Sequence, residues 1–338
     1  MPEFQWHDAA SWGVDGKGWD DTPWLYARLP VRAKGVVPDP VWDLSLMSAG
    51  LSVRFRTDAT SIAARWTLTR SQLALPHAPA SFCSGVDLYG RDHRGIWRWV
   101  AASMPATFPH VEAVLISGLD GTQREYTLYL PMFNGVERLE IGVPEGASFR
   151  GLAPKKERPI VYYGTSIVHG ACASRPGMAH AAILGRRLGV PDINLGFSGN
   201  ARMEPELARL IGEIDARIFV VDCLPNMGDA ELVRERAEPF VRILREARPD
   251  APIVLVEDRT FANAYWQERV QRAHQARREA LKDAYRRLVE AGYERLAYVP
   301  GNCLLGADGE DTVDGSHPTD LGFVRLADAL EPVLRSLL

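Results

Sequence analysis

Cysteine is scarce in this sequence, and its few cysteines are far apart. The four are Cys83, Cys172, Cys223 and Cys303, and none of them forms a CxxC pair. This spacing argues against a zinc site built on paired cysteines and against a dense disulfide framework. We therefore expect reduced thiols and no bound metal.

Long apolar runs and a leader pattern are also missing. No run approaches the roughly 20 apolar residues that a membrane-spanning helix needs. The first residues, MPEFQWHDAASWG, do not combine a basic segment with a following apolar one, which is the pattern of a secretion signal. We expect a soluble, cytoplasmic protein with no membrane partner.

Basic charge is not in excess either. The 338 residues include 39 Lys and Arg against 43 Asp and Glu, so the formal net charge is −4. A nucleic-acid-binding surface needs basic residues to neutralise phosphates, and we expect no nucleic-acid partner. The chain also lacks a G-x-x-x-x-G-K-[ST] loop and an H-E-x-x-H motif, so phosphoryl transfer and zinc proteolysis have no positive support.

The first part of the chain, residues 1–150, reads as β-structure. Its runs are LSVRFRTDAT (51–60), SIAARWTLT, VDLYGRD, GIWRWVAASM, REYTLYLPMF and VERLEIGVP. These runs are short and rich in Val, Thr and aromatic residues, and turn signals such as Asp120-Gly121 separate them. No long helical period appears among them, which predicts an all-β, jelly-roll-like sandwich domain.

The second part alternates strand-like and helix-like runs. The stretch SFRGLAPKKERP (148–159) carries Gly, Pro and charge, and we place a linker at 151–158. Apolar strands are expected at 159–163, 193–197, 217–222, 252–257 and 296–300, with helices between them, including 174–189, and a last helix at 318–336. This alternation predicts an α/β domain over 159–338, a flavodoxin-like three-layer α/β/α fold with about five parallel strands.

Chemically useful residues follow each predicted strand. The segments are GTSIVHG, GFSGNA, DCLPNM, EDRT and, one loop after the fifth strand, DGSHP. Because ligands bind at the carboxyl ends of strands in such sheets, these side chains are expected to meet at one edge. A hydroxyl, glycine amides, an asparagine amide and an Asp/His pair are the parts of an acyl-transfer site.

These segments resemble the sequence blocks of the SGNH hydrolase superfamily, also called GDSL esterases, over roughly residues 158–338. Gly164-Thr165-Ser166 stands where the family has Gly-Asp-Ser, Gly199 at its oxyanion glycine, and Asp314-Gly315-Ser316-His317 at its Asp-x-x-His. Asn226 in LPNM stands at the oxyanion asparagine, where the family usually shows Gly-x-Asn-Asp. The first half resembles the sandwich that precedes the hydrolase domain in some bacterial members acting on sugars or natural products.

The resemblance implies that Ser166 is the nucleophile of ester hydrolysis, His317 its base and Asp314 the group that orients the base. It also implies that the amides of Ser166 and Gly199 and the side chain of Asn226 stabilise the oxyanion. This mechanism needs neither a metal nor another cofactor. The serine segment differs from the G-x-S-x-G elbow of α/β-hydrolases.

Two other residues are rival nucleophiles. Ser198 lies in GFSGN, where a serine is more typical of a turn. Cys172 follows His169 closely, and a Cys–His pair can be catalytic, but a serine already occupies the strand end.

Candidates for the substrate pocket are Thr165, Arg175, Glu257 and Arg259. Three of them have a structural alternative: Arg175 is equally typical of a solvated helix start, and Glu257 and Arg259 of an ion-pair cluster. Trp66, Trp97 and Trp99 could stack on sugars, but at strand spacing they are more typical of core or interdomain packing.

We predict a serine esterase that removes a short acyl group, with acetyl as the first choice, from a carbohydrate or another polyhydroxylated molecule. Its partner is a small-molecule or oligosaccharide ester, and this choice rests on the family resemblance. An acyltransferase with the same triad and a non-catalytic carbohydrate-binding protein are the alternatives. A phosphate-ester hydrolase would need cations or metal ligands around the serine. The sequence leaves open whether the chain forms a homo-oligomer.

Overall fold

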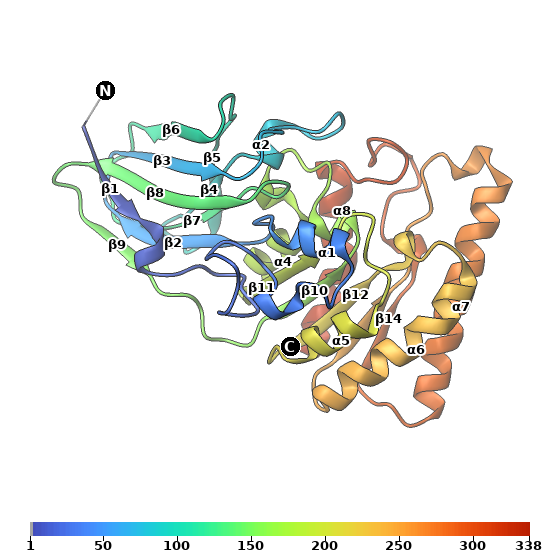
Figure 1. The fold of residues 1–338 in the computed structure, drawn as a ribbon. Coiled ribbons are helices and arrows are strands. Elements are labelled where there is room, and N and C mark those ends of the chain that lie inside the picture. The colour runs from blue at the N-terminus through green and yellow to red at the C-terminus, as the bar shows by residue number, and fades with distance from the viewer. Residues whose placement is uncertain (1–2) are drawn as a thin grey trace. The chain divides into compact units, whose positions relative to one another are not determined.

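The computed structural model describes residues 3–338, which divide into two compact units (Figure 1). The sandwich unit comprises the residues up to Pro30, Ser45–Lys156 and Ser174–Gly177. The α/β unit comprises Val31–Leu44, Glu157–Ala173 and Met178–Leu338. The main division falls inside the predicted linker, but two short segments belong to the unit opposite to the one predicted.

Residues 31–44 are one such correction, because they pack with the α/β unit. They include most of helix α1 (Asp39–Ser45) and bury Val37 and Val41 almost completely. Arg32 forms an ion pair with Glu213 of the same unit. These contacts join segments far apart in the sequence, which local patterns do not report.

The sandwich unit contains two antiparallel sheets, with strand orders β1-β8-β3-β6 and β5-β4-β7-β2-β9. The strands are β1 (Phe4–Asp8), β2 (Ser52–Thr57), β3 (Ser61–Leu68), β4 (Asp87–Arg91), β5 (Trp97–Ala102), β6 (His110–Ser117), β7 (Arg124–Tyr129), β8 (Val136–Pro144) and β9 (Phe149–Leu152). A short helix, α2 (Ala80–Cys83), precedes β4. The all-β prediction for this part of the chain is confirmed.

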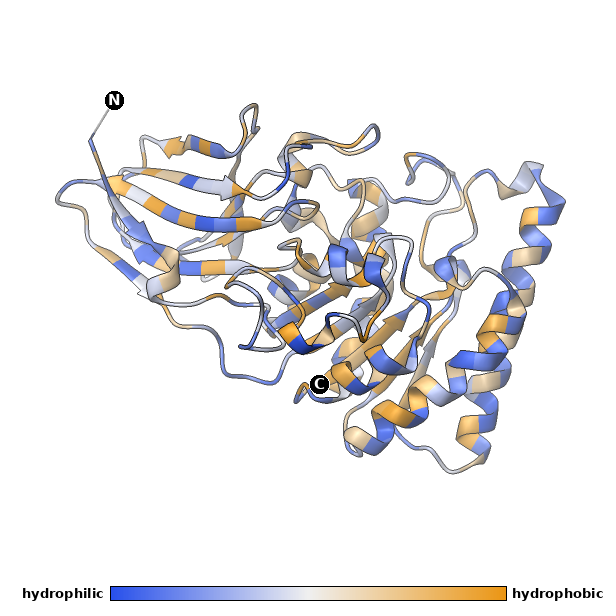
Figure 2. Ribbon diagram, in the orientation of Figure 1, coloured by the Kyte–Doolittle hydropathy of each residue, from blue (hydrophilic) through white to orange (hydrophobic). Residues whose placement is uncertain are grey.

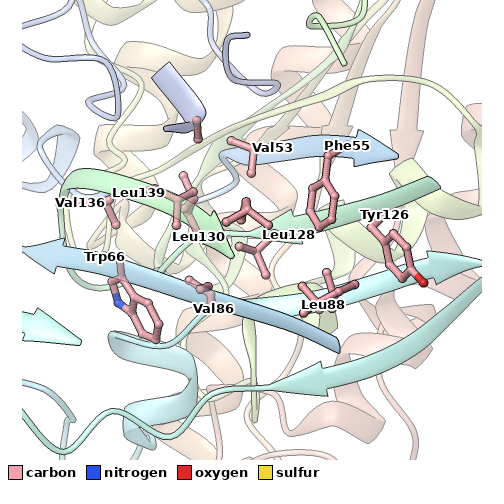
Figure 3. Packing of buried hydrophobic residues seen from close by; sticks show 14 of the residues in the cluster. Val53, Phe55, Trp66, Val86, Leu88, Tyr126, Leu128, Leu130, Val136 and Leu139 are labelled. Atoms are coloured by element: carbon pink, nitrogen blue, oxygen red, sulfur yellow. The ribbon is translucent and has the colours of Figure 1, made fainter. Parts of the chain in front are cut away.

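The core of the sandwich unit lies between its two sheets. Alternate side chains of the strands point inward, as a period of two residues requires. Phe55, Leu88 and Leu128 from one sheet and Trp66 and Leu139 from the other are all buried in this cluster (Figure 3). Trp66 is therefore a core residue and donates a hydrogen bond to the carbonyl of Ser84.

The α/β unit is built on one parallel sheet with strand order β11-β10-β12-β13-β14. Its strands are β10 (Ile160–Gly164), β11 (Asp192–Gly196), β12 (Ile218–Asp222), β13 (Ile253–Val256) and β14 (Leu296–Val299). All five predicted strands are present, and the order is that of a flavodoxin-like fold. β10, β12 and β13 are buried at every residue, as expected when helices cover both faces of a sheet.

Helices cover this sheet on both faces. They are α3 (Ser166–His169), α4 (His180–Leu188), α5 (Pro205–Gly212), α6 (Ala230–Ala247), α7 (Glu268–Glu290) and α8 (Asp320–Leu337). α4 packs on α8, while α5, α6 and α7 pack in series. Right-handed crossovers place these two groups on opposite faces. Figure 2 shows apolar residues along the strands, and apolar and polar residues alternating along α6 and α7.

Two predicted boundaries are wrong. The stretch expected to begin the linker contains β9, which pairs with β2, so the chain leaves the sandwich later than predicted. The helix expected over 174–189 begins only at His180, after a single turn at Pro176–Met178. Ala179 takes the N-cap position of this helix.

No helix among residues 3–338 is both long enough and apolar enough to span a bilayer. None of the four cysteines forms a disulfide: Cys83, Cys172 and Cys223 are buried, and Cys303 is exposed. This agrees with the expectation of reduced thiols.

Candidate active site

The carboxyl ends of β10, β11 and β12 bring three predicted blocks to one edge of the sheet. The residue pairing places Gly164 opposite Gly196 on one side and opposite Asp222 on the other. Ser166 follows the first strand, Gly199 the second and Asn226 the third. All belong to the α/β unit.

The turn that presents Ser166 depends on two glycines. A Cβ atom at Gly164 would overlap the carbonyl of Asp222, and one at Gly196 would overlap the backbone of His169. Without side chains at these positions, α3 can fold back tightly over the strand ends. The side chain of Asn194 secures this arrangement, because its Nδ2 donates to the carbonyl of Val168 at 2.7 Å.

A continuous hydrogen-bonded chain joins the three predicted catalytic side chains. Ser166 Oγ lies 2.8 Å from His317 Nε2, and His317 Nδ1 lies 2.7 Å from Asp314 Oδ2. Ser166 is nearly buried at 7% exposure, whereas the His317 and Asp314 side chains are 23% and 42% exposed. This geometry lets the imidazole take a proton from the hydroxyl while the carboxylate holds the opposite ring nitrogen.

Asp314 is also held by its own loop. Its Oδ1 accepts hydrogen bonds from the backbone N–H groups of Ser316, at 3.0 Å, and His317, at 2.8 Å. Partial burial raises the pKa of Asp314, but hydrogen bonds from the backbone and ring of His317 and from Ser316 outweigh it and bring the pKa to about 2. The carboxylate is therefore ionised at neutral pH and can stabilise an imidazolium.

A buried carboxylate fixes the loop that carries the Asp/His pair. Asp311, 1% exposed, accepts hydrogen bonds from the N–H of Gly306 and from Arg325 of α8. The N–H of Val313 donates to the carbonyl of His317 at 2.8 Å, and the N–H of Thr319 donates to that of Asp311. The loop that contains His317 is thus held by backbone contacts on both sides.

Three N–H donors at this edge have no acceptor among residues 3–338. They are the backbone amides of Ser166 and Gly199 and the side-chain amide of Asn226. Asn226 Oδ1 accepts from the N–H of Ala201 at 3.3 Å, which leaves its Nδ2 as the outward donor. Gly199 has a φ of +73°, a conformation that favours glycine. The three donors are those expected to form the oxyanion hole.

Three predicted pocket residues need correction, because their side chains are buried in structural contacts. Thr165 is fully buried, and its hydroxyl caps α3 by accepting from the N–H of Ile167. Glu257 is 8% exposed and accepts hydrogen bonds from Tyr298 and Gly301, both at 2.6 Å.

Arg259 is 2% exposed and donates through Nη2 to both carboxylate oxygens of Asp222 at 2.8 Å. Its Nε and Nη1 are buried and have no partner among the described residues. Arg259 therefore belongs to a buried ion pair, which was the structural alternative to its predicted place in the substrate pocket.

Arg175 belongs to the sandwich unit, where it is partly buried and lies outside any helix. Its guanidinium donates to Asp87 at 2.9 Å and to the hydroxyl of Tyr89, and it lies over the rings of Tyr89 and Trp99. Trp99 is 54% exposed, and its indole N–H also donates to Asp87. Trp97 is partly exposed and stacks with Arg91.

The rival nucleophiles differ from Ser166 in their contacts. Ser198 is partly exposed, and its carbonyl accepts from the side chain of Asn200, as expected of a turn. Cys172 is 6% exposed, and its sulfur lies within 4.8 Å of a ring nitrogen of His317. Ser166 Oγ lies 2.8 Å from Nε2 of that ring, at hydrogen-bond distance.

Two positioning residues were not predicted as part of the site, Asn194 and Asp222. Asn194 holds the turn that contains Ser166, and the backbone carbonyl of Asp222 accepts a hydrogen bond from the N–H of Thr165 while its carboxylate pairs with Arg259. The signal for Asn194 was its polar side chain within the apolar run INLGF. The signal for Asp222 was an acidic residue at the end of a buried strand.

The chain matches two family models that together cover most of its length. Residues 157–335 match the GDSL-like lipase/acylhydrolase family, and residues 4–149 match the N-terminal region of SGNH-hydrolase-type esterases. No curated protein matches the chain in sequence.

Solved structures share the architecture of both units. A protein from Bacteroides ovatus described as a GDSL-like lipase is 32% identical, with a TM-score of 0.94 over 99% of this chain and 98% of its own. The salicylyl-acyltransferase SsfX3 of a tetracycline biosynthetic pathway is 20% identical, with a TM-score of 0.77 over 99% and 97%. The acetyl xylan esterase Est2A of Butyrivibrio proteoclasticus is 14% identical, with a TM-score of 0.60 over 98% of each chain. The last two show a shared fold.

Proposed function

Since the chain belongs to the GDSL-like lipase/acylhydrolase family, we propose that it is a serine esterase that cleaves short-chain carboxylic esters through Ser166. One observation carries this proposal: the hydrogen-bonded chain from Ser166 through His317 to Asp314, beside three N–H donors that have no acceptor in the described part of the chain. A binding protein with an inactive site has no need for this arrangement.

In the first half of the reaction, Ser166 Oγ attacks the ester carbonyl carbon while His317 Nε2 takes the hydroxyl proton. The carbonyl oxygen becomes an oxyanion, which accepts hydrogen bonds from the amides of Ser166 and Gly199 and from Asn226. The bond to the alcohol oxygen then breaks, and His317 returns its proton to that oxygen. The products are an acyl-Ser166 ester and a free alcohol.

In the second half, water attacks the acyl-Ser166 carbonyl and gives one proton to His317. The same three donors stabilise the second oxyanion. The bond to Ser166 Oγ breaks, His317 reprotonates that oxygen, and the carboxylic acid leaves. Asp314 keeps its negative charge throughout and stabilises the imidazolium in both halves.

We assign the substrate as an acetyl ester of a carbohydrate or another polyhydroxylated molecule. Support comes from the names of structures with this fold, which include an acetyl xylan esterase and a family two carbohydrate esterase solved with cellohexaose. Acyl transfer to an alcohol is the second candidate, because the fold is also that of an acyltransferase, with a TM-score of 0.77. Transfer would use the same acyl-Ser166 intermediate, with an alcohol in place of water.

The test is hydrolysis of p-nitrophenyl acetate, butyrate and octanoate by the wild type, Ser166→Ala and His317→Ala. In another triad enzyme, removal of the serine or the histidine lowered turnover about a millionfold, so we expect the activity of both variants to fall to background. For the wild type we expect acetate to be the best of the three substrates. Cys172→Ala and Ser198→Ala are matched controls that replace the rival nucleophiles, and both should keep most of the activity.

Three outcomes would contradict the proposal or redirect it. Wild-type activity in Ser166→Ala would reject the assigned nucleophile, and loss of activity only in Cys172→Ala would assign the thiol instead. Faster release of p-nitrophenol with added glycerol or xylose, together with acetylated acceptor detected by mass spectrometry, would favour transfer over hydrolysis.

A further inference from the structure

Two adjacent aromatic side chains in the α/β unit point into solvent. Tyr265 is 79% exposed and Trp266 82% exposed, while Ala264 beside them is fully buried. Their rings meet edge to face, with centroids 5.0 Å apart and planes at 86°. Exposure of two large rings forfeits the stabilisation that burial would give, so it needs a reason outside the folded core.

The loop that carries this aromatic pair is anchored on the protein. At one end, the ring of Phe261 packs against the buried His274, with ring centroids 4.7 Å apart. At the other end, the carbonyl of Ala264 accepts hydrogen bonds from the side chain of Gln271, at 2.8 Å, and the N–H of Gln267, at 2.9 Å. The rings are thus exposed because the anchored loop directs them outward.

The same loop is attached to the loop that carries the catalytic base. The N–H of Ala262 donates to the carbonyl of Gly315 at 2.8 Å. The side chain of Asn263 covers Gly315, lying 3.1 Å from where a Cβ atom would stand. Gly315 follows Asp314 and lies two residues before His317, and Tyr265 lies three positions after Ala262, the residue that makes this backbone contact.

We propose that Tyr265 and Trp266 form a stacking subsite for a sugar ring in the alcohol part of the ester. This inference rests on the proposed esterase function and names the part of the substrate that the pair recognises. The apolar faces of a pyranose ring pack on aromatic rings, while its hydroxyls need polar neighbours. Rigid aromatic side chains make such contacts at a low cost in conformational entropy.

The surroundings of the pair favour a sugar over a lipid. Gln267, Glu268 and Arg269, which follow the rings directly, are all exposed and can hydrogen-bond to hydroxyls. A lipid or membrane would need a contiguous apolar patch, whereas here two rings stand next to charged side chains.

The kinetic test compares acetylated xylo-oligosaccharides with ethyl acetate, which has no ring to stack. For Trp266→Ala and Tyr265→Ala we expect kcat/KM on the oligosaccharides to fall about tenfold, mainly through KM. Activity on ethyl acetate should be unchanged. Trp266→Phe keeps a ring and should retain most of the activity, and Met104→Ala removes a similarly exposed apolar side chain, 84% exposed, from the sandwich unit. If the ratio of activity on the oligosaccharides to activity on ethyl acetate is the same in the wild type and in all variants, the inference is overturned.

A binding test separates this inference from the proposed function. Xylohexaose and cellohexaose are titrated into Ser166→Ala and into Ser166→Ala/Trp266→Ala by calorimetry. Binding that is weakened about tenfold in the double variant supports the subsite, even if the wild type hydrolyses no ester and the proposed function fails. Equal affinity for the two proteins, or no binding of either sugar, overturns the inference. Unchanged sugar affinity with a dimer that dissociates in the Trp266 variant would instead assign the rings to a contact between copies.

Discussion

The carboxylate of Asp87 accepts hydrogen bonds from the Arg175 guanidinium at 2.9 Å and from the N–H of Gly177 at 2.8 Å. Asp87 is fully buried and lies in the sequence Gly85-Val86-Asp87-Leu88-Tyr89. Through these bonds the sandwich unit holds Ser174–Gly177, a segment whose chain neighbours on both sides belong to the α/β unit. Gly177 has no space for a side chain, because a Cβ atom would overlap the ring of Tyr89.

We expect Asp87→Ala to lower the free energy of unfolding by about 3 kcal/mol, since removing one partner of a buried ion pair leaves the other charge unpaired. Urea unfolding followed by circular dichroism measures this loss. Asp120→Ala breaks an exposed pair with Arg124 in the same unit and should have a much smaller effect. A similar loss of unfolding free energy in the two variants would show that Asp87 contributes no more to stability than an exposed carboxylate does.

The side chain of Asn226 should act on the transition state more than on substrate binding. We expect Asn226→Ala to lower kcat for p-nitrophenyl acetate about 100- to 1000-fold, the usual cost of one oxyanion donor, with little change in KM. Asn200→Ala is the matched control, because the Asn200 amide is already bonded to the carbonyl of Ser198. An equal effect of both substitutions would point to a change in the loop rather than to a lost donor.

The Arg259–Asp222 pair is a stability determinant beneath the site. Both side chains are almost fully buried, and burial raises the pKa of Asp222 while the charge of Arg259 lowers it. Arg259→Met leaves a buried carboxylate without its partner and should cost about 3–5 kcal/mol. Arg335→Met, which breaks an exposed pair with Glu331, should cost far less in the same urea titration. A double variant, Arg259→Met/Asp222→Asn, should recover part of the loss, and failure to do so would contradict the ion-pair explanation.

His180 should make the fold sensitive to acid. Burial, with a smaller contribution from the charge of Arg259, lowers its pKa to about 3, whereas an unfolded histidine has a pKa of about 6.5. Between these values the unfolded chain binds a proton that the folded chain does not. The contribution of His180 to the free energy of unfolding is therefore fully present above pH 6.5. It falls, by at most about 1.4 kcal/mol per pH unit, as the pH drops toward 3.

The measurement is urea unfolding of the wild type and His180→Gln from pH 7 to pH 4. The variant cannot take up this proton, so its stability should fall less steeply with acid. Parallel curves for the two proteins would mean that His180 does not titrate differently in the folded and unfolded states.

Local patterns predicted the strands and the chemistry at their ends. β2, β3, β4 and the five parallel strands were visible because side-chain alternation and continuous apolar runs are properties of neighbouring residues. The candidate nucleophile and base were visible for the same reason, since Ser166 lies two residues after a buried strand and Asp314 stands three residues before His317. β9 was missed, because its place depends on pairing with β2, almost a hundred residues earlier in the chain.

The sequence by itself determined the order of the elements, the two-part architecture and the residue types available for acyl transfer. Only the tertiary structure decided which side chains are accessible. Thr165 and Arg259 are buried, Arg175 is bonded to Asp87, and Tyr265 and Trp266 are exposed. Exposure depends on which distant segments pack over a residue, and a pattern of neighbouring residues does not contain that information.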